Sequence, residues 1–438
     1  MFGYYLSLAL RSLRRNFILA ALMVIAIGVG IGASMTMLTI FRAASGDPIP
    51  GKSARLFTPQ LDNFGPGGAW RGYPEALPPL LTYLDVSAWM RAHVAVRQAA
   101  MYPTRLSITP ADPTRNPIRV DARATYADFF PMFDVPFEYG GPWNRTEDEA
   151  HATVVVLTRP LNDLLFGGTN SVGSTLTIDA KVYRIIGVLD KWRPSPRFYD
   201  VGGQSYSGAD ELFVPFTRAI DEQMQTDSTL NCDSKGGGKG WDGLLHSNCI
   251  WMSFWAELTT ADEVTRYRVY LHNYATEQRR TGRFAWLPKT ELRDVTQWLS
   301  YSRVVPSTVD TLTGVSFALL AVCVLNAVGL LLANFMARSG TVCVRRALGA
   351  TRPAIFAQFM IEAGVIGLVG GLLGIGLTEL GLLSCRVVLQ ADLTVLTRLH
   401  GTDVLIATAV ALGATLLAGL YPTWRATRVE PALQLKTL

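Results

Sequence analysis

Residues Arg338–Gly376 read RSGTVCVRRALGATRPAIFAQFMIEAGVIGLVGGLLGIG, and this stretch joins a basic segment directly to a long apolar one. In the basic part, apolar side chains accompany Arg345 and Arg346, a pattern typical of an amphipathic helix at a membrane surface. The apolar part is long enough to cross a lipid bilayer. The stretch therefore predicts a surface helix fused to a membrane span. A partner on the cytoplasmic side can push on this surface helix.

The composition indicates a membrane protein with four spans. Of the 438 residues, 49% are hydrophobic and 17% are charged, and the apolar residues gather in four blocks. These blocks predict transmembrane helices at 17–41, 309–337, 354–383 and 403–421. The first block exceeds the ~7–15 apolar residues of a signal peptide, so we interpret it as a retained anchor rather than a cleaved leader.

The placement of arginines predicts the orientation of the spans. Arginines cluster before the first span, between the second and third spans, and after the fourth. The positive-inside rule then puts an amphipathic helix at 1–16, the segment 338–352 and a tail at 422–438 in the cytoplasm. The long segment 42–306 and the shorter loop 384–402 are expected on the other side of the membrane.

Residues 42–306 predict a large α/β domain built from two parts. Strand patterns at 97–108 and 250–258 and helical patterns at 85–96 and 261–280 lie on either side of a central β-rich stretch. We expect one subdomain from two flanking halves, about 45–125 and 249–305, and a second, β-rich subdomain inserted at about 126–215. The finer expectations are strands at 118–125, 153–157, 172–178, 182–189 and 211–215, a short helix at 126–133 and a loop at 226–248.

Two cysteines in this domain predict a disulfide. Cys232 and Cys249 are the only cysteines in the segment outside the cytoplasm, and they bracket a glycine-rich stretch. In an oxidising compartment such a pair favours a disulfide, and the alternative is two free thiols in a flexible loop. No metal site is expected, because only His246 is near and no Cys-x-x-Cys motif occurs.

The sequence predicts no catalysis or nucleotide binding by this chain. Gly46–Ser53 has the letters of a Walker A motif, but Pro48 and Pro50 lack the backbone N–H groups that cradle a phosphate. No recognisable catalytic triad or carboxylate pair occurs. Because the net charge of +5 comes mainly from arginines that set topology, nucleic-acid binding is not expected either.

Glycines in the predicted spans indicate close helix packing. Gly28 and Gly32 are four residues apart in the first span, and Gly367, Gly371 and Gly374 form similar small-residue faces in the third. For the first span, packing within one subunit and association between subunits remain equally open. For the third span, packing within the subunit is favoured.

Polar side chains are energetically costly inside a membrane, so each one in the predicted spans requires an explanation. Asn326 and Asn334 in the second span favour hydrogen bonds between helices over contacts with a substrate. Glu362 lies near the cytoplasmic end of the third span, where its carboxylate can reach the interface or pair with an arginine. A role for Glu362 in proton coupling is the less favoured alternative.

Three stretches together resemble a known family. The first is Val344–Arg352 with the following Phe359–Glu362, and the second is Tyr421–Leu435 near the C-terminus. The third stretch lies outside the cytoplasm and comprises Tyr126–Phe133, Val154–Leu157, Leu165–Gly167, Val172–Leu176 and Ile185–Leu189. With the order of one span, a long outer domain and three spans, the chain resembles the MacB/FtsX-type permease superfamily of ABC transporters. One departure is Gly340–Cys343, where the family usually has an acidic residue followed by Ile–Gly before the arginine pair.

The resemblance implies a permease in the bacterial inner membrane, with a porter-like periplasmic domain and an inserted β-rich part. It implies a dimer with a second permease copy or a paralogue, bound to ATPase subunits that hold the ATP and Mg²⁺. The segment 338–352 would be the coupling helix that contacts the ATPase. Its contact residues would be Arg345, Arg346, Ala347, Leu348, Gly349, Ala350 and Thr351.

The resemblance also implies a mechanism and its alternatives. ATP hydrolysis would move the helices, and this motion would reach the periplasmic domain to drive efflux or secretion of peptides or amphipathic compounds. A periplasmic adaptor, an outer-membrane channel and membrane lipids would be further partners. No ATPase is expected to be fused to the N-terminus here. A lipoprotein-releasing permease and an FtsX-like regulator of envelope enzymes remain alternatives.

Overall fold

The computed structural model describes residues 17–65, 76–110, 116–201, 209–232, 238–304, 307–337, 344–346, 348–388 and 401–427, together with Gly3, Arg11 and Gly340. The chain divides into two compact units. The helical unit comprises residues 1–45 and 305–438, and the α/β unit comprises residues 46–304. Apart from Gly3 and Arg11, the predicted helix at 1–16 lies outside the described residues, as do most of the loop 384–402 and most of the tail 422–438.

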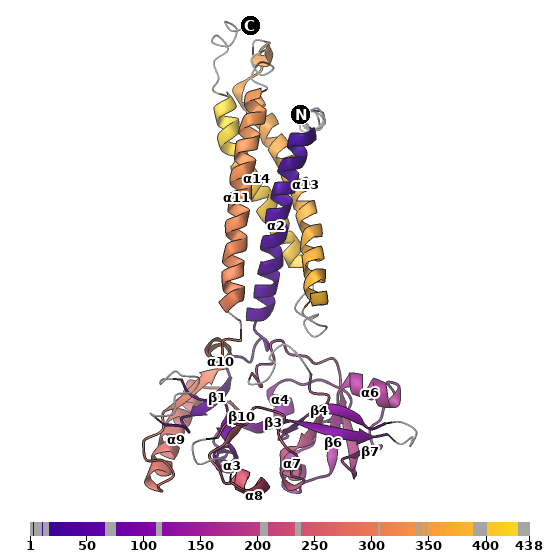
Figure 1. Cartoon of the computed structure of the whole chain (residues 1–438), viewed down its shortest axis with the longest axis vertical. Helices are drawn as coiled ribbons and strands as arrows, with labels where there is room; N and C mark the ends of the chain where they lie inside the picture. Colours follow the sequence, from indigo (N-terminus) through magenta and orange to yellow (C-terminus); the bar gives the residue numbers. More distant parts are fainter. Residues whose placement is uncertain are drawn as a thin grey trace. The chain divides into compact units, whose positions relative to one another are not determined.

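Within its described residues, the helical unit contains four long helices (Figure 1). They are α2 (Phe17–Ser45), α11 (Ser307–Ala337), α13 (Arg352–Val388) and α14 (Gly401–Thr427). Each contains a segment apolar and long enough to cross a membrane, which confirms the four predicted spans. The helices extend past the predicted spans because a helix can continue into the membrane interface and beyond it.

Glycines decide how closely the first and third spans approach each other. A Cβ atom on Gly28 would lie 2.8 Å from Leu373, and one on Gly32 would lie 2.8 Å from Leu377. Both leucines belong to α13 of the same chain, and Gly374 of α13 faces Ile31 of α2 in return. The glycines of α2 therefore allow close packing within the chain, and an additional role in association between subunits stays a prediction.

Glycines of α13 serve the contact with α14 as well. A Cβ atom on Gly371 would lie 2.9 Å from the Cβ atom of Ala411, and Gly367 faces Thr415. The hydroxyl of Thr415 donates to the carbonyl of Ala411 at 2.7 Å, so its own helix satisfies this polar group. The prediction of packing within the subunit therefore holds for the third span.

The described part of the α/β unit contains eleven strands in one mixed sheet. Their order is β11-β1-β10-β3-β4-β9-β6-β8-β5, with β2 beside β10 and β7 beside β3 and β8. The strands are β1 (Leu56–Leu61), β2 (Leu81–Thr82), β3 (Arg97–Thr109), β4 (Ile118–Thr125), β5 (Phe137–Gly140), β6 (Val154–Leu157), β7 (Thr175–Ile178), β8 (Lys181–Leu189), β9 (Leu212–Pro215), β10 (Ile250–Glu257) and β11 (Thr290–Asp294). The strands from the flanking halves occupy one side of this order and the strands from residues 137–215 the other, joined by the parallel pair β4–β9.

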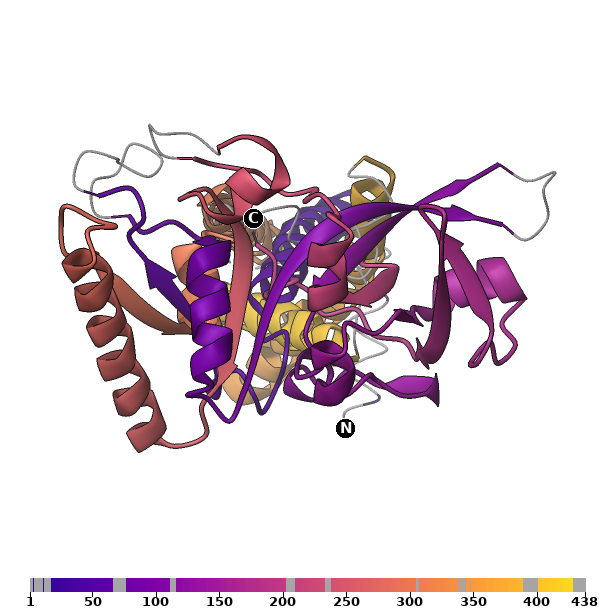
Figure 2. The ribbon, with the colours of Figure 1, turned by 90° about the horizontal axis from the view of Figure 1, so that it is seen from below.

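Eight helices accompany the described strands. They are α3 (Tyr83–Ala92), α4 (Phe129–Met132), α5 (Arg145–Glu149), α6 (Arg159–Phe166), α7 (Phe216–Asp221), α8 (Gly240–Leu245), α9 (Ala261–Arg280) and α10 (Val295–Tyr301). Figures 1 and 2 show α9 and α6 near opposite ends of the sheet. The longest, α9, begins at a capping box in which Thr260 accepts the Glu263 N–H and the Glu263 side chain accepts the Thr260 N–H.

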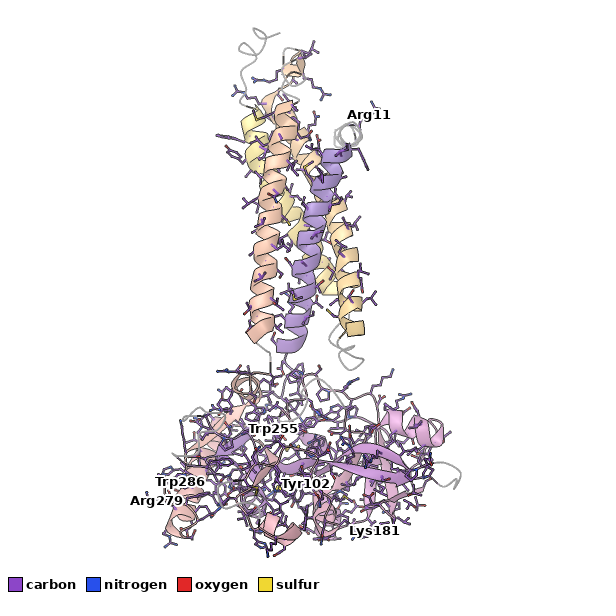
Figure 3. All side chains as sticks on the ribbon, viewed as in Figure 1. Arg11, Tyr102, Lys181, Trp255, Arg279 and Trp286 are labelled. Carbon is purple, nitrogen blue, oxygen red and sulfur yellow. A yellow bond between two sulfur atoms is a disulfide. The ribbon has the colours of Figure 1, made fainter. Side chains whose placement is uncertain are left out.

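The sheet is buried on both faces, and β3 shows why. Tyr102 points into one core, where its ring meets Trp251 edge to face at 4.9 Å. The preceding residue, Met101, points into the other core, which holds Trp255 and many phenylalanines. Figure 3 shows Tyr102 and Trp255 in the interior of the unit. Alternation along the strand therefore supplies two cores from one segment.

Several boundaries differ from the sequence expectation. The helix expected at 85–96 ends at Ala92, because His93 adopts the left-handed conformation with φ 46°. The short helix expected at 126–133 is reduced to α4, and the strand expected from 172 begins at Thr175. The loop expected at 226–248 contains α8. The strands β1 and β11 were not predicted, and their pairing across the chain explains how they form.

Candidate functional site

The turn between α11 and α13 ends a short helical segment at Gly349. The Ala350 N–H donates to the Arg345 carbonyl at 3.0 Å, and the Gly349 N–H donates to the Arg346 carbonyl at 3.1 Å. This pair of bonds is the Schellman pattern, and Gly349 has the positive φ of 97° that it requires. A residue with a Cβ atom resists this conformation, so the glycine sets where the segment stops.

The side chains of this turn differ in their contacts and in their exposure. The Arg345 guanidinium donates to the Gln358 Oε1 atom of α13 at 2.8 Å, so this arginine holds the turn against the following helix. Leu348 is 82% exposed, and Val344 is exposed as well. Arg346 is half-buried, and Ala347 lies outside the described residues. An exposed leucine beside an arginine suits an apolar pocket with acidic groups on a partner.

The next helix begins immediately after this turn. Thr351 directly precedes α13, and Pro353 is the second residue of the helix. Proline is tolerated there because the first helical N–H groups have no partner within the helix. The turn Gly349–Thr351 thus redirects the chain within three residues, and the position of Leu348 depends on both flanking helices.

The polar residues of the spans fall into two groups. Glu362 is fully buried and Asn334 is 3% exposed, so both lie inside the helical unit. Asn326 is exposed on the surface of α11. A hydrogen bond between helices of one chain is therefore not the role of Asn326 here, and its amide faces outward.

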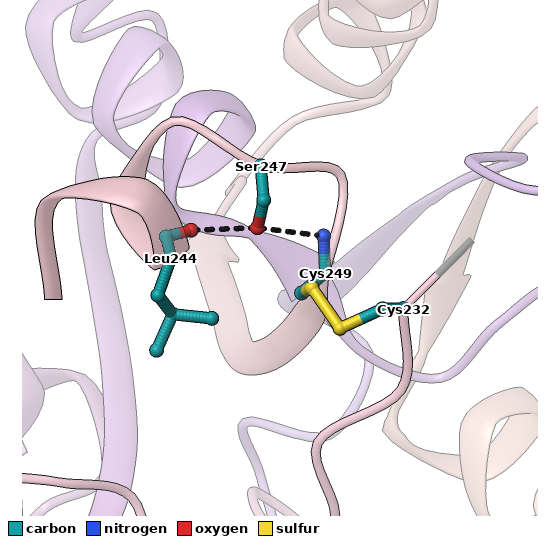
Figure 4. Close-up of a disulfide and its surroundings, with 4 residues drawn as sticks. All are labelled: Cys232, Leu244, Ser247 and Cys249. Atoms are coloured by element: carbon teal, nitrogen blue, oxygen red, sulfur yellow. Dashed lines mark hydrogen bonds between the residues drawn. A yellow bond between two sulfur atoms is a disulfide. The ribbon is translucent and has the colours of Figure 1, made fainter. Parts of the chain in front are cut away.

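The α/β unit contains the disulfide between Cys232 and Cys249, as the sequence predicted. Figure 4 shows the Ser247 hydroxyl donating to the Leu244 carbonyl and accepting the Cys249 N–H, at 2.7 and 3.1 Å. Cys249 is fully buried. Closing a loop of this length removes chain entropy from the unfolded state, a stabilisation of about 3 kcal/mol.

The chain passes between the two units twice. The helices at these two connections pack together in the helical unit, and the nearest strands pair in the α/β unit. The helices α2 and α11 pack together, and the Ser34 hydroxyl of α2 donates to the Ser316 carbonyl of α11 at 2.9 Å. In sequence, α2 is followed by β1, and α11 is preceded by β11 and α10. These two strands are themselves an antiparallel pair, with Phe57 opposite Asp294 and Leu61 opposite Thr290. Two adjacent helices are thus continued by two adjacent strands.

Two family matches cover most of the chain. Residues 20–253 match the family described as MacB-like periplasmic core domain, and residues 313–431 match the one described as FtsX-like permease C-terminal. The chain belongs to the MacB/FtsX-type permease superfamily of ABC transporters. The resemblance inferred from the sequence is thereby confirmed, with an outer domain of the MacB periplasmic type between the first and second spans.

Curated relatives of this superfamily are distant in sequence. The macrolide export ATP-binding/permease protein MacB of Azoarcus sp. (strain BH72) is 23% identical over 98% of this chain and 58% of that protein. The protein of the same name from Rhodospirillum rubrum is 25% identical over 99% of this chain and 60% of its own length. The chain therefore spans about three fifths of the length of these relatives.

Solved structures of periplasmic regions also match. The periplasmic region of MacB from Actinobacillus actinomycetemcomitans covers 60% of this chain and 95% of its own, with 12% identity and a TM-score of 0.36. The extracellular domain of the ABC-type transporter YknZ from Gram-positive bacteria covers 48% and 87%, with 12% identity and a TM-score of 0.31.

The sequence predicted the turn, but it did not predict the contact between Arg345 and Gln358 or the role of a carboxyl in the α/β unit. Nothing in the sequence pairs Arg345 with Gln358, because they lie on different helices. It also missed Asp148, a carboxyl that lines a cleft of the α/β unit. The capping box of α5, in which Asn144 and Glu147 bond reciprocally, was the available signal for a helix that carries Asp148 inward.

Proposed function

We propose that this chain is the permease subunit of an ABC transporter that acts by mechanotransmission. ATP hydrolysis on a separate ATPase subunit moves the helices, and the helices move the outer α/β unit. The work done is efflux or secretion of peptides or amphipathic compounds. The ATPase holds the ATP and Mg²⁺, and this chain contributes no catalytic group.

The continuation of two adjacent helices by two adjacent strands carries this proposal. Because α2 and α11 pack side by side, a force that shifts one against the other has to be absorbed by the chain that follows them. After residues 46–55 the chain from α2 forms β1, and β11 leads to α11 through α10. The strands β1 and β11 share a hydrogen-bonded ladder at the edge of the sheet. A ladder transmits displacement because its hydrogen bonds and packed side chains resist continuous deformation.

The turn at Arg345–Thr351 supports the role of a coupling element. In the proposed orientation it lies in the cytoplasm with both chain termini, at the inner membrane of a bacterium. Leu348 offers an exposed apolar side chain, and Arg346 adds a positive charge. The bond from Arg345 to Gln358 ties the turn to α13, so force on the turn reaches the third span directly.

A second permease copy or a paralogue completes the proposed complex. The exposed amide of Asn326 would be unfavourable against lipid, so a partner helix on this face of α11 would satisfy it. A periplasmic adaptor and an outer-membrane channel are the further proposed partners, and membrane lipids surround the spans.

Co-purification with the cognate ATPase tests the coupling turn. Leu348→Glu places a charge where an apolar contact is proposed, and Arg346→Glu reverses the proposed charge. Each is expected to lower the amount of retained ATPase at least tenfold. The matched control is Leu164→Glu, since Leu164 is 60% exposed on α6 of the α/β unit, and it is expected to retain the ATPase. If both turn variants insert into the membrane and bind the ATPase like the wild type, this coupling role is wrong.

A reversible cross-link tests mechanotransmission itself. Ser34→Cys and Ser316→Cys are introduced where α2 and α11 touch, after the three cysteines outside the disulfide are replaced by alanine. Joining the helices is expected to leave ATPase binding intact and to abolish the ATP-dependent change in tryptophan fluorescence of the α/β unit. Reduction is expected to restore that change. An unchanged fluorescence response in the cross-linked protein would contradict transmission through these helices.

A further inference from the structure

A cleft of about 630 Å³ opens in the α/β unit where flanking and inserted segments meet. One side is formed by α3, with Tyr83 and Met90, and Tyr126 follows β4 at the start of the inserted segment. The inserted side is formed mainly by α5, with Arg145 and Asp148. A volume of this size is in the range of pockets that hold drug-sized molecules.

One wall of the cleft is aromatic. The ring of Tyr126 stacks on Phe216 with centroids 4.9 Å apart, and the ring of Tyr83 is parallel to Phe216 at 6.4 Å. Met90 adds an apolar, adaptable side chain to the same lining. Such a wall offers area for an apolar or aromatic body, and aromatic faces also attract cations.

Asp148 supplies the polar part of the lining. Its carboxylate accepts the Trp143 Nε1–H and the Ala127 N–H, each at 2.8 Å. These bonds hold the group in place and leave further lone pairs on both oxygens. Among the described residues no Lys, Arg or His forms a salt bridge with it, although it is only 4% exposed. A buried carboxyl that lacks a cationic partner is unusual.

Other charged groups of the cleft are already engaged or lie at its rim. Asp128 pairs with Arg145 at 3.5 Å, and Arg145 also contacts His93 at 3.1 Å. His151 pairs with Asp221, and Glu149 and Arg91 are exposed. Water screens the exposed Glu149 and Arg91 at the rim, and Asp128 is paired with Arg145, so the charge left inside the cleft is that of Asp148 when it is ionised. A single positive charge would balance it.

The carboxyl of Asp148 can gain or lose its proton near neutral pH. The pKa of Asp148 is raised to about 7, chiefly by burial; its two hydrogen bonds act to lower it, and the nearby Asp128 and Glu147 act to raise it. A cation placed in the cleft would favour the ionised form. Binding of the cation and loss of the proton would therefore be linked.

We propose that this cleft binds an organic monocation with an aromatic or apolar body. Asp148 is its counter-ion, and the wall of Tyr83, Tyr126 and Met90 packs against the body. Only the biological role of this binding rests on the proposed function. If that function holds, the bound compound is the cargo or the signal of the α/β unit. The binding itself requires no ATPase.

Two matched probes test the proposal on the full chain in nanodiscs. The probes are 4-(4-fluorophenyl)butylamine and 4-(4-fluorophenyl)butanol, which differ in charge but share the apolar body. Fluorine NMR titrations, corrected with empty nanodiscs, give their dissociation constants. At pH 8 the amine is expected to bind at least tenfold more tightly than the alcohol. Because protons compete for Asp148, amine affinity is expected to fall by roughly tenfold per pH unit below 7, while alcohol binding stays constant.

Variants identify the counter-ion. Asp148→Asn is expected to remove the preference for the amine at pH 8, and Glu149→Gln, which removes an exposed carboxyl of the same cleft, is expected to keep it. Tyr126→Ala is expected to weaken both probes about equally, by threefold or more. The pH series on the wild type stands even if Asp148→Asn fails to fold. The proposal is overturned if the amine has no advantage at pH 8, if its advantage persists at pH 5.5, or if Glu149→Gln removes it.

The outcome is independent of the coupling test. Loss of ATPase binding in the turn variants would leave the probe titrations unchanged, because the probes bind the α/β unit. Failure of the titrations would likewise leave the coupling proposal standing.

Discussion

Asp148 and Asp210 are two of the buried carboxyl groups in the α/β unit, and their surroundings push their charge in opposite directions. Asp148 accepts two hydrogen bonds but forms no salt bridge with a described cation, and burial raises its pKa to about 7. Burial would also raise the pKa of Asp210, but Arg123 and Arg197 hold it below its ordinary value. Burial alone therefore does not determine the charge of a carboxyl, because the nearest partner decides it.

The surroundings of Asp210 form a closed network. Arg123 is completely buried, and it donates to Asp210 at 2.7 Å and to Asp200 at 2.6 Å. The Tyr199 hydroxyl donates to Asp210 at 2.9 Å, and the Arg123 guanidinium lies 4.9 Å from the centre of the Tyr199 ring. Arg123, Arg197 and Tyr199 stabilise the ionised carboxylate of Asp210, whereas no described cation forms a salt bridge with Asp148.

The largest expected effect comes from removing the cation at the paired site. Arg123→Met keeps much of the side-chain volume but leaves two buried carboxylates without their main partner. The free energy of unfolding is expected to fall by about 3–5 kcal/mol, measured by chemical denaturation with tryptophan fluorescence. The control Arg105→Met breaks exposed salt bridges to Asp121 and Asp227 and is expected to cost far less, because water screens these charges. Equal costs for the two variants would show that the buried network is not special.

The second prediction concerns pH at the site without a cation. Because the folded pKa of Asp148 is raised, the folded state holds its proton more tightly than the unfolded state, so this contribution to stability falls as pH rises. Between pH 5 and 8 the expected loss is about 2–3 kcal/mol. The measurement is the difference between the wild type and Asp148→Asn in denaturation at each pH. A difference that stays constant with pH would mean that Asp148 titrates in its ordinary range.

The contribution of Asp210 to stability is expected to depend on pH with the opposite sign. Its lowered pKa contributes stability above the unfolded pKa, and this is lost only as pH falls through the folded value. Between pH 5 and 8 its contribution should therefore be constant.

A third, smaller effect measures one hydrogen bond of the network. Tyr199→Phe removes the donor to a carboxylate and is expected to cost about 1.5–3 kcal/mol. The matched control is Tyr102→Phe, because the Tyr102 hydroxyl is also buried but donates to the Met224 carbonyl at 3.0 Å. That neutral bond is expected to contribute about 1 kcal/mol. If the two variants unfold at the same denaturant concentration, the charge on Asp210 adds nothing to the bond.

The smallest effect is expected at the exposed carboxyl of the cleft. Glu149→Gln is expected to change the free energy of unfolding by no more than about 0.5 kcal/mol, because water already solvates this group. Its pH profile between 5 and 8 should match that of the wild type. A flattened profile in Glu149→Gln would assign the titration to the wrong carboxyl.

Local signals in the sequence were sufficient for several features. The four spans were predicted because the length and apolar content of a transmembrane helix are set by the bilayer alone. The disulfide was predicted because few cysteines were available to pair. The basic turn before the third span was predicted from its arginines, and Gly349 within it takes a φ of 97°, which glycine adopts without strain.

Other features depended on residues that are distant in sequence. The strands β1 and β11 are short and are separated by more than two hundred residues, so neither contains a signal for the other. The glycines of α2 could face another helix of the same chain or a second subunit, and only the folded chain places Gly28 and Gly32 against Leu373 and Leu377. The exposed position of Asn326 was equally invisible, because a helical pattern that is apolar all round does not mark a buried face.

The sequence by itself determined the order of the four apolar helices and the α/β domain, the disulfide pair and the basic turn between the second and third spans. Each of these depends on composition, chain length or the conformational range of one residue. Only the tertiary structure decided that Asp210 meets Arg123 while Asp148 meets no cation. The charge of a buried group is set by atoms within a few ångströms, and those atoms come from segments that only the folded chain brings together.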